Sequence, residues 1–108
     1  MSTKIKFGVE ELEKKIGVLT FARLLESYRL SDERSQKDFA KFLGISQQSL
    51  CDLEKGRKIP SPDRAARIAK KLHEPEDFWI KLSLQDILRS QNFHYEVSLS
   101  EAKKKKAA

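Results

Sequence analysis

Apolar residues recur every three or four positions along most of this chain, a spacing that gives a helix one buried side. Around Gly44 the pattern predicts two short helices. The first follows Ser35, a good N-cap residue, and places Phe39 and Leu43 on the same side. Gly44 then stands where a helix ends in left-handed backbone, which glycine adopts without strain. We therefore expect the chain to turn at this glycine.

The second helix of the pair is expected to begin after Ser46 and to end at Gly56. Leu50 and Leu53 supply its buried side. The positions left off that side are Gln47, Gln48, Cys51 and Asp52. In a helix-turn-helix motif this end of the second helix enters the major groove of DNA. The spacing over residues 35–56 therefore favours a DNA reader, with these four side chains as candidate base contacts.

Three further helices are expected around this pair, which makes the fold class all-α. Thr20 caps the first of them, and Ser61 begins the second. Pro75 opens the last, over residues 76–91. Together the five helices form one domain over residues 19–91.

The two ends of the chain depart from this helical pattern. Residues 1–18 are expected to form an arm and a short helix, and residues 101–108 a disordered basic tail. Residues 92–100 alternate apolar and polar side chains, which predicts a short C-terminal β-strand. Its partner is left open: the segment 5–9, the same strand of a second copy, or a strand of another protein.

The last helix carries apolar residues on more than one side. Trp79 and Leu82 fall on one side, and Leu84 and Ile87 on the other. One small core cannot cover both, so we expect a second copy to cover part of them, unless the N-terminal arm does. The residues expected at this homodimer contact are Trp79, Ile80, Leu84, Ile87, Leu88, Phe93, Tyr95 and Val97.

The segment from residue 19 to residue 72 resembles the lambda-repressor-like, Cro/CI family of helix-turn-helix domains. The matching positions are Gln36, Ala40, Gly44-Ile45-Ser46, Gln47-Gln48, Ser49-Leu50 and Leu53-Glu54-Lys55-Gly56-Arg57. Only the step from Gln36 to Ala40, four residues rather than five, needs the looser form of the family pattern. The resemblance implies a five-helix domain that dimerises through its fifth helix and binds double-stranded operator DNA.

Two sets of residues are implied to touch that DNA. The resemblance sets Gln36, Gln47 and Gln48 against it and residues 55–58 on its backbone. With the candidates from the pattern, the expected DNA-binding residues are Gln36, Ser46, Gln47, Gln48, Cys51, Asp52, Lys55, Arg57 and Lys58.

Glutamine has the chemistry that such a role needs. Its amide can make one bidentate contact to adenine, worth roughly 1–3 kcal/mol of discrimination. An isolated pair such as Gln47 and Gln48 would more often be ordinary solvated residues, and it is the surrounding motif that favours DNA contact. Asp52 would be repelled by phosphates, so we expect it to pair with a neighbouring Arg or Lys rather than to read a base.

Charge is concentrated in the same region. The formal net charge of the 108 residues is +6, and residues 35–72 hold nine Lys or Arg against four acids, an excess of +5. A polyanion such as DNA would be attracted to this part of the chain. Basic helices are also common on solvated surfaces, so the charge supports the motif and does not replace it.

Other classes of function find little support in the sequence. Cys51 is the only cysteine in the sequence, which excludes an internal disulfide and fits a reducing cytoplasm. We expect the protein in the bacterial cytoplasm, associated with the nucleoid. A redox role for Cys51 stays open. His73 and His94 lack partners at ligand spacing, so no metal site is expected. We expect no enzyme activity, no cofactor and no membrane segment.

The sequence therefore predicts a transcriptional regulator, a repressor that binds an inverted-repeat operator as a homodimer. Two forms of such a repressor, an antitoxin and a stand-alone repressor, are equally compatible with the sequence. The short C-terminal appendage resembles those of antitoxins in toxin–antitoxin modules, which would add a toxin protein as partner, and a stand-alone repressor would need none. An adaptor that uses the same fold to bind protein or RNA is the third alternative, against which the glutamines and basic residues argue.

Overall fold

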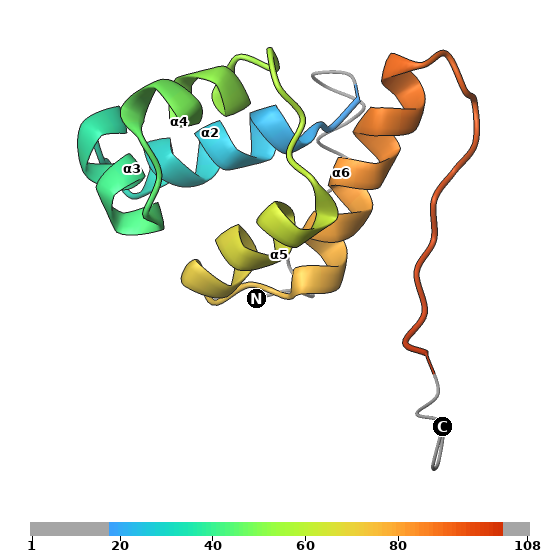
Figure 1. The fold of residues 1–108 in the computed structure, drawn as a ribbon. Helices are drawn as coiled ribbons and strands as arrows, with labels where there is room; N and C mark the ends of the chain where they lie inside the picture. The colour runs from blue at the N-terminus through green and yellow to red at the C-terminus, as the bar shows by residue number, and fades with distance from the viewer. Residues whose placement is uncertain (1–17, 103–108) are drawn as a thin grey trace.

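The structure is a computed structural model, and it describes residues 18–102. The arm and short helix expected over residues 1–18, and the tail beyond residue 102, lie outside the described residues apart from Val18. In the described part the five expected helices are α2 Phe21–Ser31, α3 Gln36–Leu43, α4 Gln47–Glu54, α5 Pro62–Lys71 and α6 Glu76–Ser90. Helices α2, α3 and α4 lie together, and α5 packs mainly on α6, beside them (Figure 1).

Four of these helices begin at the polar residues that the sequence marks as caps. The side-chain oxygens of Thr20, Ser35, Ser46 and Ser61 each accept a hydrogen bond from the backbone N–H three residues later, at 3.0–3.2 Å. Each bond satisfies a donor that the first turn of a helix would otherwise leave unpaired. The start of α6 is different, because Pro75 precedes it and offers no side-chain cap.

Gly44 makes the turn between α3 and α4. Its φ of 77° is left-handed, as expected, and the N–H of the next residue, Ile45, donates back to the Ala40 carbonyl at 3.0 Å. Because α3 stops there in a fixed geometry, the direction in which α4 leaves is fixed too.

The core lies where the five helices meet. Its buried apolar residues are Leu19, Phe21, Leu25, Phe39, Ala40, Leu43, Leu50, Leu53, Ala65, Ile68, Ala69, Leu72, Trp79 and Leu82. Trp79 is fully buried, and its ring meets Phe21 edge to face at 5.4 Å and Tyr28 at 6.1 Å.

This position of Trp79 corrects the sequence interpretation, which assigned it to a homodimer contact. A side chain with 0 % exposure inside one chain cannot form a contact with a second. The other helical residues of that expected contact, Ile80, Leu84, Ile87 and Leu88, are half-buried.

The β-strand expected over residues 92–100 is also corrected, because the described residues contain no strand. Asn92 takes left-handed backbone (φ 65°), which Asn tolerates better than most residues, and turns the chain at the end of α6. Residues 93–102, here called the C-terminal arm, then run extended beside α6 (Figure 1). The alternation predicted a strand, but a strand also needs a partner strand, and the described residues provide none.

Candidate nucleic-acid interface

The first turn of α4 presents two glutamines to solvent. Ser46 holds this end of the helix, because its hydroxyl accepts the Ser49 N–H at 3.0 Å. Gln47 and Gln48 follow and are both exposed. The Gln48 amide donates to Asp52 one turn on, at 3.1 Å, whereas no hydrogen bond of the Gln47 side chain is found among residues 18–102. Both amides lie at the exposed start of a short helix whose first turn is capped by Ser46.

Asp52 pairs with a neighbouring arginine, as the sequence interpretation expected. Arg57 Nε donates to Asp52 Oδ1 at 3.0 Å, and Arg57 Nη2 lies 3.3 Å from Cys51 Sγ. The bond from Arg57 lowers the pKa of Asp52, and the same bond raises the pKa of Arg57. The acid is thereby screened, and Arg57 is held along the outer side of α4 with about half of its side chain exposed.

Gln36 lies partly inside the protein, in a network that sequence reasoning did not find. Its Nε2 donates to Glu54 Oε1 at 3.0 Å, so this donor is directed at the end of α4 rather than at solvent. Glu54 is almost fully buried and also accepts from Arg29 Nε at 2.7 Å and Nη2 at 3.0 Å. The hydrogen bonds that Arg29 donates to Glu54 raise the pKa of Arg29. Arg29 also reaches the Arg34 carbonyl at 3.0 Å.

This network ties the last turn of α2 to the last residue of α4. A buried carboxylate is tolerated only when its lone pairs are occupied and its charge is paired. Here three donors occupy it, so the orientation of α4 relative to α2 is set by charged hydrogen bonds as well as by Leu50 and Leu53 in the core.

The other two basic residues of the expected site, Lys55 and Lys58, have exposed side chains. Lys55 is the C-cap residue of α4, and Lys58 lies in the loop that follows; both are exposed. Their ammonium groups can therefore meet phosphates that flank the first turn of α4.

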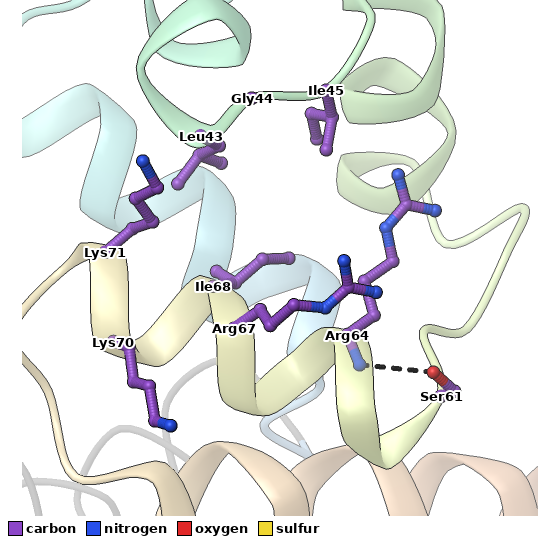
Figure 2. Close-up of a pocket in the computed structure, with 9 residues that line it drawn as sticks. All are labelled: Leu43, Gly44, Ile45, Ser61, Arg64, Arg67, Ile68, Lys70 and Lys71. Atoms are coloured by element: carbon purple, nitrogen blue, oxygen red, sulfur yellow. Dashed lines mark hydrogen bonds between the residues drawn. The ribbon is translucent and has the colours of Figure 1, made fainter.

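A basic cleft adds residues that the list of expected contacts lacked. It has a volume of about 730 Å³ and lies between the turn after α3 and the outer side of α5. Figure 2 shows its lining: Leu43, Gly44, Ile45, Ser61, Arg64, Arg67, Ile68, Lys70 and Lys71. Arg64 rises from α5 toward the turn, Arg67 runs along α5, and Lys71 rises beside Leu43, while Lys70 points away from the cleft (Figure 2).

The cleft is accessible to an anion because its cations are weakly held. Arg67 pairs with Asp63 at 3.0 Å, but both of these side chains are mostly exposed. The excess of positive charge in the sequence was the signal for this surface. Its place could not be derived, because the cleft exists only where α5 packs beside the α3–α4 turn.

No helix in residues 18–102 is both long and apolar enough to cross a membrane. Among the residues that the structure describes, no group of His, Cys, Asp and Glu side chains is placed to hold a metal ion.

Comparison with known proteins agrees with this geometry. An uncharacterised HTH-type transcriptional regulator of Methanocaldococcus jannaschii is 44% identical over 46 residues, which cover 43% of this chain and 70% of that protein. No solved structure matches the chain. Residues 25–79, from α2 through the start of α6, match the helix-turn-helix family. The chain belongs to this family, in its Cro/CI-type form, whose proteins are DNA-binding transcription regulators.

Proposed function

We propose that this protein is a sequence-specific repressor that binds an inverted-repeat operator as a homodimer. The single observation that carries the proposal is the first turn of α4, where a capped helix start exposes Gln47 and Gln48. Glutamine amides there can read base edges from the major groove, the usual site of the second helix of this motif.

The surrounding cations supply the phosphate contacts. Lys55, Arg57 and Lys58 follow α4, and Arg64 and Lys71 line the cleft beside the turn that precedes it. Phosphate contacts fix the position of a protein on a duplex, and they give its affinity a strong dependence on salt. Asp52 and Cys51 hold the Arg57 side chain in position and do not read bases themselves.

The homodimer follows from the need to bind two half-sites. A two-fold pair of reading helices about one helical turn apart matches an inverted repeat. Ile80, Leu84, Ile87 and Leu88 leave part of α6 exposed for such a contact, and Phe93, Tyr95 and Val97 extend it along the C-terminal arm.

Selection of duplexes from a random pool by the full-length protein tests the proposal. We expect enrichment of an inverted repeat whose half-sites lie about 10 base pairs apart. Recovery of no common sequence would contradict specific DNA binding, and recovery of a single half-site would contradict the homodimer.

A second candidate, the antitoxin of a toxin–antitoxin module, is favoured by one feature, the C-terminal arm with its exposed Phe93, Tyr95 and Leu99. An antitoxin would bind the same operator and also hold its toxin through this arm. Co-expression with the product of the adjacent reading frame distinguishes the two forms: a complex that is lost when residues 93–102 are deleted supports the antitoxin, and no complex supports the stand-alone repressor.

A further inference from the structure

The C-terminal arm has one hydrogen-bonded edge. In an extended strand the peptide groups of alternate residues point to the same edge. The Phe93 N–H donates to the Leu88 carbonyl at 2.9 Å. The Gln85 amide donates to the Tyr95 carbonyl at 2.6 Å and accepts from the Val97 N–H at 2.8 Å. The bond from Phe93 closes the C-terminal turn of α6, and on the same edge the Gln85 side-chain amide takes the place of a peptide group of a neighbouring strand.

The opposite edge of the arm is open in the part of the chain that the structure describes. It carries the peptide groups of His94, Glu96 and Ser98, for which residues 18–102 offer no hydrogen-bond partner. Phe93 is 47% exposed and Tyr95 69%. An open strand edge flanked by exposed apolar side chains is a template for pairing with another strand.

We propose that this free edge pairs antiparallel with the same edge of a second copy, so that the Tyr95 side chains of the two copies meet at the two-fold axis. The inference rests on the proposed homodimer and deepens it, because it specifies how the C-terminal arms of the two copies meet in addition to the contact through α6. It makes the arm an intermolecular β-ribbon, each strand of which is backed by its own α6.

The free edge restricts which residues can face each other. Only residues 94, 96 and 98 point their peptide groups outward, so the hydrogen-bonded pairs must be formed between these positions. With Tyr95 on the axis, His94 lies opposite Glu96 of the partner subunit, and the same pair recurs by symmetry. An imidazole N–H can donate to a carboxylate there. Phe93 lies opposite the partner subunit's Val97, so one face of the ribbon is apolar throughout.

Other registers match the sequence less well. If one strand is shifted by two residues in one direction, Glu96 lies opposite Glu96 of the partner subunit. Like charges in opposed positions destabilise a strand pair. A shift of two residues in the other direction places Val97 opposite the partner subunit's Gln91, the residue that caps the end of α6. A slide of four sets Phe93 opposite Glu101. The segment is thus complementary to itself at Tyr95, which argues for a second copy rather than an unrelated protein.

Cysteine cross-linking tests both the partner and the register. In full-length protein with Cys51→Ser, Tyr95→Cys places the only thiol on the axis, where opposed residues are about 4.5 Å apart between Cα atoms and can form a disulfide. Val97→Cys is the matched control, because the two copies of that position would lie about 13 Å apart along the strands. With oxidised glutathione, we expect most Tyr95→Cys protein to become a reducible dimer while Val97→Cys stays monomeric on denaturing gels.

A charge exchange tests the same contact without a new bond. His94→Glu places two carboxylates opposite each other in both of the symmetry-related 94–96 pairs. We expect this to lower the dimer affinity measured by sedimentation equilibrium by roughly 2- to 30-fold. Adding Glu96→Lys should restore it, and His94→Gln should leave it nearly unchanged. Both residues are exposed in the single chain, so folding should be unaffected.

Three outcomes overturn the inference: a Val97→Cys cross-link, no cross-link at Tyr95, or a dimer indifferent to His94→Glu. Binding of the selected duplex by wild-type protein is measured alongside. If that binding persists while Tyr95→Cys fails to cross-link, the inference fails and the proposed DNA reading stands. If no specific duplex is bound, the proposed function fails whatever the arm does.

Discussion

The buried pair of Arg29 and Glu54 should be the most sensitive polar contact in the described part of the protein. Arg29→Met removes two of the three donors to Glu54 and leaves its carboxylate without a counter-charge. Only 1% of the Glu54 side chain and 13% of the Arg29 side chain are exposed, so water cannot replace the lost bonds. Breaking a buried pair from one side costs about 3–5 kcal/mol, and we expect this loss of unfolding free energy.

Urea denaturation followed by circular dichroism measures this loss. The matched control is Arg67→Met, which breaks the exposed pair with Asp63 and should cost less than about 1 kcal/mol. The double variant Arg29→Met with Glu54→Leu should lose less than Arg29→Met alone, because no charge then stays buried. A loss below about 1 kcal/mol for Arg29→Met, equal to the control, would refute the argument that this pair holds α4 in place.

Three further predictions concern the DNA backbone, the dimer and pH. Arg57→Ala and Arg64→Ala should each weaken all duplexes alike and reduce the slope of log affinity against log salt by about one unit, measured by anisotropy; an unchanged slope removes the residue from the phosphate contacts. Leu84→Asp should place a charge in the α6 contact and yield a folded monomer in sedimentation, and a wild-type monomer at micromolar concentration would contradict the dimer. Burial raises the pKa of Asp86 from 3.8, against the effect of the Phe21 N–H that it accepts. The stability that Asp86 contributes is therefore fully present below pH 3.8 and is lost as pH rises through the raised pKa. Asp86→Asn should remove this loss of stability, which is measured by comparing urea denaturation curves at about pH 3 and about pH 7. A variant with the same pH dependence as the wild type would contradict the prediction.

Local features of the fold could be predicted from the sequence because their causes are local. The caps at Ser35, Ser46 and Ser61 and the left-handed turn at Gly44 depend on residues within one helical turn, and all four are present. The pairing of Asp52 with Arg57 followed from the same short range.

Contacts between distant segments could not be derived in this way. Arg29 and Glu54 are 25 residues apart, and no periodicity marks them as partners. A helical wheel shows that α6 has apolar residues on several sides, but not which side its neighbours cover, so Trp79 was assigned to a surface that it does not reach. The C-terminal arm was misjudged for a related reason: alternation predicts a strand, but a strand also needs a partner strand, and residues 18–102 contain none.

DNA reading by the first turn of α4 is tested most directly by a competition titration with the selected operator duplex and a scrambled duplex of equal length. Gln47→Ala and Gln48→Ala should each lower operator affinity by about 1–3 kcal/mol and leave affinity for the scrambled duplex nearly unchanged, because only base contacts are lost. Gln91→Ala is the control, an exposed glutamine at the far end of α6 that should change neither affinity. Equal losses on both duplexes, or no loss on either, would contradict the claim that the first turn of α4 reads the sequence of DNA.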